Sequence, residues 1–312
     1  MIKLAPGVEA CPGHKLTKPL GQGGFGSVWE AIGPDGKKVA LKFLDCRGAH
    51  SSIIVNEIKL LLTLRDLKHP NLIQFINIHT GPSTIILSME LADGSVNDLH
   101  YIYREDTKSH VPPPVLMSIM EQTAAALDFL SNQRLHTSGF SKTGMQHCDV
   151  KPSNLLLLGN VVKVADFGLS GPMQFNTARN IILGTPPYAA PELFEGRMTE
   201  RTDQFGMAIT YCELRAGRFP IPISDDGRYP TTAPDFSFLP DRERMVVARA
   251  IQKQWLDRYP SCMEFVDALK RVMDSKPVPY APSQPQSGVR KINPFGSTPR
   301  QIPSHPTKLG GH

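Results

Sequence analysis

Along the first third of the chain, apolar residues alternate with polar ones, which is typical of β-strands with one buried face. Residues 38–44 predict one arm of a β-hairpin, and the β-prone residues 27–32 lead into it. A further strand is predicted at 85–89, and it ends at the polar residues 90–94. One amphipathic helix is predicted at 53–64, because its apolar residues recur at helical spacing.

The pattern changes to helical spacing after this polar hinge. Three prolines precede an amphipathic helix predicted at 115–132, and a more apolar, buried helix is predicted at 202–216. The last helix is predicted to begin at Ser261, where Glu264 completes a capping box. Residues 134–145 predict a surface loop. The chain is therefore expected to be an α+β protein, with a small β-rich first part and a larger, mostly helical second part.

Composition favours a globular enzyme. The chain has 312 residues, of which 40 % are hydrophobic, and its apolar runs are too short for a membrane span. The opening residues predict no signal peptide. The cysteines are odd in number and lack paired metal spacing, which favours free thiols in a reducing compartment such as the cytoplasm; they are Cys11, Cys46, Cys148, Cys212 and Cys262.

The net charge of +5 is located in the last 38 residues, 275–312. This segment has five cations, no acid and eight prolines, so it predicts a disordered tail, and the rest of the chain has 29 cations against 29 acids. Nucleic-acid binding by the folded part is therefore not expected. The spaced prolines are compatible with a polyproline-binding partner, although a solvated extension is the simpler interpretation.

A cluster of polar side chains lies near the middle of the chain. Asp149 and Asn154 lie five residues apart on a predicted tight loop, with Lys151 between them. The apolar run 161–165 predicts a buried strand that ends at Asp166. Hard oxygen ligands of this kind suit Mg²⁺, which usually shares its coordination shell with substrate phosphates. These residues therefore predict transfer of a metal-held phosphoryl group, with Asp149 able to meet a hydroxyl proton.

The glycine-rich run at 21–26 has three interpretations: a dinucleotide-binding fingerprint, a phosphate-covering flap or a plain turn. A dinucleotide fold needs a helix after the glycines, whereas residues 27–32 are β-prone. This favours the flap, in which backbone amides approach phosphate oxygens and Val28 covers the base.

Together these motifs resemble the protein kinase family, in order, over residues 14–274. The resemblance is to eukaryotic-like serine/threonine kinases. Residues 202–205 and Cys148 are closer to bacterial members of the family. It implies a two-lobed kinase fold with an N-lobe at about 14–91 and a C-lobe at about 94–274. An N-terminal extension, 1–13, would precede this domain.

The resemblance implies a nucleotide site. Lys42 would contact the α- and β-phosphates of ATP and form an ion pair with Glu57 on the predicted helix. Asn154 and Asp166 match the metal ligands, for Mg²⁺ with Mn²⁺ as an alternative. The residues expected to bind ATP are Leu20, Gly21, Gln22, Gly23, Gly24, Phe25, Gly26, Ser27, Val28, Ala40, Lys42, Met89, Glu90, Leu91 and Leu156.

The resemblance also implies a protein acceptor. Asp149 would orient the acceptor hydroxyl, and Lys151 would neutralise the transferred group and pair with Thr185, as in serine/threonine kinases. Thr185 and Pro186 belong to 184–192, which resembles the segment that docks the acceptor peptide.

Other residues would have structural roles in the family. Glu192 would be anchored by a buried arginine, for which Arg258 is the best candidate, and Asp203 would hold the backbone of the catalytic loop. An apolar column between the lobes would consist of Leu61, Phe75, His147 and Phe167.

One departure concerns control. Cys148 stands where the family usually has an arginine that binds the phosphate of an activated loop, and a neutral thiol cannot make that bond. We expect activity that does not depend on phosphorylation of Ser170 or Thr177. A redox role for Cys148 has a weaker basis.

Two rival functions remain. A pseudokinase or signalling scaffold would bind nucleotide without efficient transfer, yet Lys42, Asp149, Asn154 and Asp166 are all present. A small-molecule phosphotransferase would not need the docking segment 184–192. The physiological substrate and the oligomeric state stay open.

Overall fold

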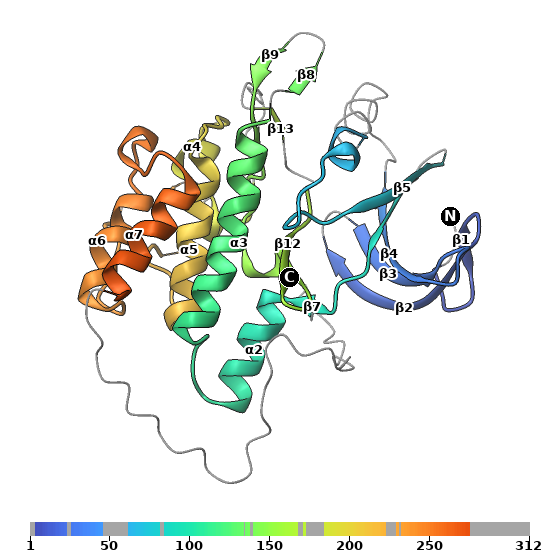
Figure 1. Ribbon diagram of the computed structural model, residues 1–312, viewed down its shortest axis with the longest axis horizontal. Coiled ribbons are helices and arrows are strands. Elements are labelled where there is room, and N and C mark those ends of the chain that lie inside the picture. Colours follow the sequence, from blue (N-terminus) through green and yellow to red (C-terminus); the bar gives the residue numbers. More distant parts are fainter. Residues whose placement is uncertain are drawn as a thin grey trace, which may run out of the picture. The chain divides into compact units, whose positions relative to one another are not determined.

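The structure, a computed structural model, describes residues 4–23, 26–45, 62–81, 84–133, 135–137, 140–167, 171–172, 184–222, 229–230 and 232–274. Within these residues the chain forms two compact units (Figure 1). The first contains the chain up to Lys68 and Ile73–Asp93. The second contains His69–Leu72 and the chain from Gly94 onwards. The expected tail, 275–312, lies outside the described residues.

A six-stranded antiparallel sheet dominates the first unit, with the strand order β1-β2-β3-β4-β6-β5. The sheet curls, because the rings of His14 on β2 and His79 on β5, near opposite edges, have centroids 5.4 Å apart. The strands are β1 (Glu9–Cys11), β2 (His14–Gly23), β3 (Gly26–Ile32), β4 (Lys38–Asp45), β5 (Phe75–Thr80) and β6 (Thr84–Glu90).

The centre of this sheet is its most buried part. Residues 39–44 of β4 and 85–89 of β6 are buried, as expected for inner strands of a curled sheet that is covered on both faces. The strands predicted at 27–32, 38–44 and 85–89 are confirmed as β3, β4 and β6. Of the helix predicted at 53–64, the structure describes only the last residues, and 62–66 are helical.

The second unit is mostly helical. Its long helix α3 packs against α5 and α7 (Figure 1), and nearly every residue of α5 is buried. The helices predicted at 115–132 and 202–216 are confirmed as α3 and α5, and α3 begins earlier because prolines occupy its first turn. The helices are α2 (Val96–Asp106), α3 (Pro113–Ser131), α4 (Pro191–Phe194), α5 (Thr202–Ala216), α6 (Asp241–Ala250) and α7 (Cys262–Asp274).

Short strands surround the loop that carries the polar cluster. β11 (Leu155–Leu158) pairs with β12 (Val161–Val164) on one side and with β7 (Gly94–Ser95) on the other. Just before the loop, β10 (Met145–Gln146) pairs with β13 (Gly171–Pro172).

The prediction of a surface loop at 134–145 is wrong. β8 (Leu135–Thr137) and β9 (Phe140–Thr143) form an antiparallel hairpin there, and β10 begins at the end of the segment. The strands are too short to show a recognisable alternation of apolar and polar residues.

Three helices were not predicted: α2, the four-residue α4 and α6. The start of α2 has a local signal, because Ser95 and Asp98 form a capping box: the Ser95 hydroxyl accepts from Asp98 N at 3.2 Å, and Asp98 Oδ2 accepts from Ser95 N at 2.8 Å. None of the helices in the described ranges is both long and apolar enough to span a bilayer.

The α3–α7 contact includes a long-range helix cap. The carboxylate of Asp128 on α3 accepts hydrogen bonds from the backbone N–H groups of Cys262 and Met263, at 2.8 and 2.9 Å. These donors belong to the first turn of α7 and have no partner within their own helix. Ser261 accepts from Glu264 N at 3.1 Å, so the predicted cap at Ser261 forms beside this second one.

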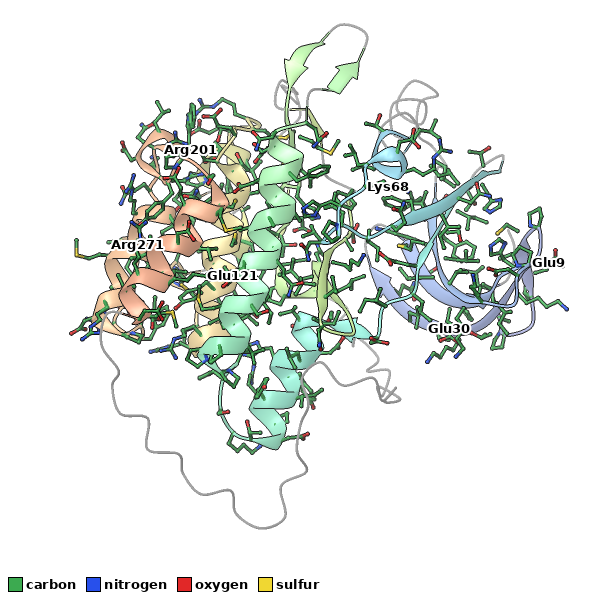
Figure 2. The ribbon with its side chains drawn as sticks, in the orientation of Figure 1. Glu9, Glu30, Lys68, Glu121, Arg201 and Arg271 are labelled. Atoms are coloured by element: carbon green, nitrogen blue, oxygen red, sulfur yellow. The ribbon has the colours of Figure 1, made fainter. Side chains whose placement is uncertain are left out.

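We predict that Asp128→Ala lowers the free energy of unfolding by at least about 1 kcal/mol, since it leaves two α7 donors without an acceptor. Denaturant unfolding of the full chain measures this effect. Glu121→Ala is the matched control: Glu121 is also on α3 (Figure 2) and reaches Lys270 of α7 at 2.8 Å, but both side chains are about 40 % exposed. The control should cost no more than about 1 kcal/mol, and equal costs would contradict the capping role.

Candidate active site

The polar cluster is built on the β11–β12 hairpin of the second unit. The chain leaves β10, forms a loop, makes one 3₁₀ turn (Pro152–Asn154) and enters β11. It returns along β12, and Ala165 N then donates to Asn154 O at 2.9 Å. This bond brings the end of the loop next to the chain that leads into Asp166, so the two predicted metal ligands come from neighbouring backbone segments.

Asp149 lies at the centre of the loop and is buried. Its Oδ1 accepts hydrogen bonds from the backbone N–H and the hydroxyl of Thr185, at 2.9 and 2.7 Å. Its Oδ2 accepts one from Asn154 Nδ2 at 2.8 Å and lies 2.8 Å from Lys151 Nζ. The structure thus brings four residues of the predicted site together in one network.

The charge of Asp149 is stabilised by this network. Burial by itself would raise its pKa, but hydrogen bonds from Lys151 and Thr185 and the charge of Lys151 outweigh burial and hold the pKa below its ordinary value. The carboxylate is therefore ionised at neutral pH. Such a group is a good acceptor that can orient a hydroxyl, and a weak base that takes the proton only when the oxygen becomes acidic.

Thr185 is held against the loop from both sides. Lys151 Nζ donates to its hydroxyl, which itself donates to Asp149. The residue before it, Gly184, has φ +96°, and a Cβ at this position would lie 2.5 Å from the carbonyl oxygen of Cys148. Glycine is needed here because any other side chain would push the 184–192 segment away from the catalytic loop.

Asp203, at the start of α5, fixes the backbone of the loop. Its carboxylate accepts from His147 N and from Cys148 N, each at 2.7 Å. Cys148 has φ +67°, a left-handed conformation that is costly for a residue with a side chain, and these two bonds hold it there. The predicted role of Asp203 is confirmed. Burial raises its pKa, and Glu192 adds to this, against the opposing effects of His147 and the two backbone bonds.

The ring of His147 also serves the backbone. Its Nδ1 accepts from Asp149 N at 3.2 Å, which leaves Nε2 as the protonated nitrogen that donates to Ala165 O at 2.8 Å. Its edge faces Phe167, with ring centroids 5.1 Å apart. His147 and Phe167 are the two members of the predicted apolar column that belong to the second unit. Leu61 lies outside the described residues, and Phe75 belongs to the first unit.

The donor atoms fit a hard cation. Both hydrogen bonds of the Asn154 side chain use Nδ2, toward Asp149 O and Oδ2, so its amide oxygen is not used in either. Asp166 supplies a carboxylate and has φ +66°, a second left-handed residue in this short region. An amide oxygen and a carboxylate on adjacent segments suit Mg²⁺ or Mn²⁺.

The first unit carries most of the residues expected to bind ATP. The buried Lys42 on β4 is the cross-strand partner of Val28 on β3 and Leu87 on β6, and Ala40 is the partner of Met89. The predicted glycine run spans the end of β2 and the start of β3, which are paired antiparallel. Leu156 is on β11 in the second unit. Gly24, Phe25 and Glu57 lie outside the part of the chain that the structure describes.

Glu192 and Arg258 form a buried ion pair in the second unit, which confirms the predicted partner. Two parallel hydrogen bonds of 2.7 Å join the guanidinium to the carboxylate, and Arg258 is fully buried. Thr202 Oγ1 donates to Glu192 Oε1 at 2.9 Å, and Arg258 Nε donates to Gln252 O at 2.9 Å. The two parallel hydrogen bonds and the contacts with Thr202 and Gln252 therefore compensate both charges, as a buried ion pair requires.

Cys148 is sealed inside this region. Its thiol lies 3.3 Å from the sulfur of Met198, a contact that no sequence pattern predicted. Burial first, and then the charges of Asp203, Glu192 and Asp149, raise its pKa well above the ordinary value. The thiol is therefore neutral and poorly reactive, which disfavours a redox role.

Comparison with known proteins identifies this arrangement. The model of the protein kinase domain matches residues 14–273. The chain belongs to the protein kinase family. Its kinase relatives are found in plants and in bacteria.

Three relatives illustrate the range. The chain is 32 % identical over 212 residues to serine/threonine-protein kinase TIO of Arabidopsis thaliana, which covers 67 % of the chain and 15 % of the relative. It is 31 % identical over 215 residues to PTI1-like tyrosine-protein kinase 2 of Arabidopsis thaliana (65 % and 56 %). It is 28 % identical over 279 residues to serine/threonine-protein kinase PknF of Mycobacterium tuberculosis (82 % and 56 %). The aligned part of the chain thus spans about half or less of these relatives.

We predict that Glu192→Gln lowers the free energy of unfolding by about 3–5 kcal/mol, because it leaves the Arg258 guanidinium buried without a counter-charge. Denaturant unfolding measures the loss. Glu195→Gln is the control, since Glu195 pairs with Arg197 at an exposed site and should change stability by no more than about 1 kcal/mol.

The double variant Glu192→Gln/Arg258→Met tests the cause. It removes both charges, so it should recover part of the stability that Glu192→Gln loses. A Glu192→Gln loss no larger than the Glu195→Gln loss would contradict the importance of the buried pair.

Proposed function

We propose that this protein is a serine/threonine protein kinase that transfers the γ-phosphoryl group of ATP to a hydroxyl of a protein. The observation that carries the proposal is the network in which Asp149, Lys151, Asn154 and Thr185 meet within hydrogen-bond distance. Membership of the protein kinase family supports the same reaction.

In this mechanism Asp149 holds the acceptor hydroxyl by accepting its hydrogen bond. Its lowered pKa suits a role in which it aligns the nucleophile and takes the proton as the new P–O bond forms. Lys151, whose Nζ lies 2.8 Å from the same carboxylate, neutralises charge on the transferred group. Its Nζ also bonds to Thr185, so the acceptor segment and the catalytic loop are positioned together.

Mg²⁺, or Mn²⁺ as an alternative, would be held by Asn154 and Asp166 and would neutralise phosphate charge. Asn154 supports this role because its Nδ2 is bound to Asp149, which orients the side chain and leaves the amide oxygen for the cation. Lys42 and the glycine-rich β2–β3 region would bind the phosphates, with Glu57 as the partner of Lys42 and with Val28, Ala40 and Met89 around the base.

The acceptor is proposed to be serine or threonine. The Lys151–Thr185 pair supports this choice, although one relative is named a tyrosine kinase. The 184–192 segment, anchored through Glu192 to Arg258, offers a firm platform for a peptide. A small-molecule acceptor would not need that platform.

A pseudokinase is the alternative, in which the fold binds nucleotide and signals by shape. It would be expected to lack one of the groups that perform transfer. The proposed kinase retains Lys42, Asp149, Asn154 and Asp166, and three of these four lie together in the second unit. A cytoplasmic location and a polyproline-binding partner for the tail are further parts of the proposal and rest on composition alone.

We predict that Asp149→Asn lowers the rate of transfer at least about 10²-fold, because the amide keeps the shape but cannot accept a proton as a carboxylate does. Purified full chain and labelled ATP with Mg²⁺ measure transfer to general protein substrates and to the chain itself. Mass spectrometry then identifies the acceptor side chains.

Asp267→Asn, on an exposed position of α7, is the matched control and should keep the activity of the unchanged protein. Equal transfer by the Asp149→Asn variant would refute the mechanism. Absence of transfer by the unchanged protein, with ATP binding intact, would favour the pseudokinase, and label on tyrosine alone would refute the acceptor class.

Activation is proposed to be independent of a phosphorylated loop. The buried, neutral thiol of Cys148 occupies the position where the family usually has a phosphate-binding arginine. Ser170 and Thr177, the acceptor-like residues of this loop, lie outside the described residues.

We predict that Ser170→Ala/Thr177→Ala keeps kcat/KM within about threefold of the unchanged protein, since no cation at position 148 awaits a phosphate. Transfer to a substrate after phosphatase treatment is the measurement. Lys42→Met, which removes the proposed phosphate contact, provides the inactive reference. If the double alanine variant loses activity while its folding and ATP binding are intact, activation depends on the loop.

A further inference from the structure

A two-residue hairpin turn at the beginning of the first unit places a thiol beside an imidazole. Cys11 ends β1, His14 begins β2, and the two are cross-strand partners. Pro12 and Gly13 form the turn between them, with Gly13 at φ +75°. Directly paired residues project from the same face of a sheet, so this turn presents Cys11 and His14 side by side.

A third side chain reaches the same place from the other end of the sheet. His79 lies on β5, the edge strand farthest from β1 in the strand order. The thiol of Cys11 and one ring nitrogen each of His14 and His79 all lie within 4.8 Å of one another. Cys11 and His14 are buried, and His79 is half-buried. The curl of the sheet therefore brings three metal-ligating groups together, although His14 and His79 are 65 residues apart in sequence.

The hydrogen bonds leave ring nitrogens available. A carbonyl oxygen can only accept, so the 2.8 Å contact of His14 Nδ1 with Pro12 O places the proton on Nδ1 and the lone pair on Nε2. Histidines that bind metals commonly donate their other nitrogen to a backbone carbonyl in this way. Nε2 of His79 is buried and has no hydrogen-bond partner among the described residues. A buried polar atom without a partner is costly unless something else binds it.

We propose that Cys11, His14 and His79 bind a Zn²⁺ ion. Thiolate sulfur and imidazole nitrogen are its preferred ligands, and its bond lengths of about 2.0–2.3 Å in a tetrahedron require ligand atoms roughly 3.3–3.6 Å apart. Small side-chain rotations bring atoms within 4.8 Å to that separation. A water molecule occupies the fourth position.

The local electrostatics act in two directions: the negative charge of Glu9 favours a nearby cation, whereas the raised pKa of Cys11 opposes loss of the thiol proton. Glu9 lies on β1 next to the hairpin turn (Figure 2), and its Oε1 accepts from Gly13 N at 2.8 Å. Burial and the negative charge of Glu9 raise the pKa of Cys11, so the metal-free group is a thiol, and Zn²⁺ binding releases its proton to solvent. The ion would join β1 and β2 to β5 and close the curled sheet. This role is separate from phosphoryl transfer and does not depend on it.

Co²⁺ titration of the tag-free full chain tests the site, because a thiolate ligand gives a charge-transfer absorption band that Zn²⁺ then abolishes by displacement. One Co²⁺ per chain is expected. Cys11→Ser should remove the band and weaken binding more than about 100-fold, since loss of a ligand exceeds the roughly 10–100-fold effect of losing its supporting bond. Cys212→Ser, which removes a buried thiol of α5, is the matched control and should keep both.

His79→Gln separates loss of a metal ligand from loss of the fold, because this half-buried position tolerates an amide of similar size. It should weaken Co²⁺ binding to a similar extent as Cys11→Ser while its circular dichroism stays that of the unchanged protein. Hydrogen exchange of the full chain should slow on Zn²⁺ addition in Glu9–Cys11 and Phe75–Thr80, and only with His79 present. Absence of Co²⁺ binding, a thiolate band that persists without Cys11, or protection located elsewhere would each overturn the proposal.

Discussion

The catalytic loop depends on one buried carboxylate. Asp203 accepts the backbone N–H groups of His147 and Cys148 at 2.7 Å and so holds Cys148 in a left-handed conformation that it would not adopt alone. The direction in which Asp149 leaves the backbone follows from this conformation, and the bonds from Asp149 to Thr185 and Lys151 follow from that direction. Because Asp203 is at the first turn of the nearly fully buried α5, a helix packed in the interior of the second unit determines where the Asp149 carboxylate lies.

The same device recurs at the docking segment, with a side-chain donor in place of the backbone. Glu192 is joined to Arg258 by two bonds of 2.7 Å, and Arg258 in turn donates to the carbonyls of Arg201 and Gln252. A buried pair of this kind adds little net stability compared with apolar packing. Removing only one of its two partners, however, lowers the stability of the fold strongly. Its geometric value is that it joins segment 184–192 to the loop before α7. The Asp149 loop and segment 184–192 are thus each held by a buried carboxylate with well-aligned hydrogen bonds.

Much of this arrangement could be predicted from local sequence. Long periodic elements such as β4, α3 and α5 were recognisable because their apolar spacing extends over many residues. The motif spacing indicated Asp149, Asn154 and Asp166, and the resemblance to protein kinases indicated the anchors Asp203 and Arg258. Contacts between distant segments that belong to no recognised motif could not be predicted: the Asp128 cap on α7, the Met198 contact of Cys148 and the contact of His14 with His79 each join residues far apart in sequence. The short strands β8 and β9 were not predicted because three or four residues are too few to show a periodic pattern.

The change of control that we propose for Cys148 leaves the proposed chemistry of the loop unaltered. The loop conformation is enforced through the N–H of residue 148, a group that every residue except proline possesses. The side chain at this position therefore does not determine the loop conformation. An arginine there would add only a binding site for the phosphate of an activated loop. With cysteine, the side chain turns inward against Met198 and carries no charge. Asp149 keeps its position and its lowered pKa through Lys151 and Thr185, which do not involve that side chain. In the proposed function, transfer and its activation are consequently separable properties of this loop.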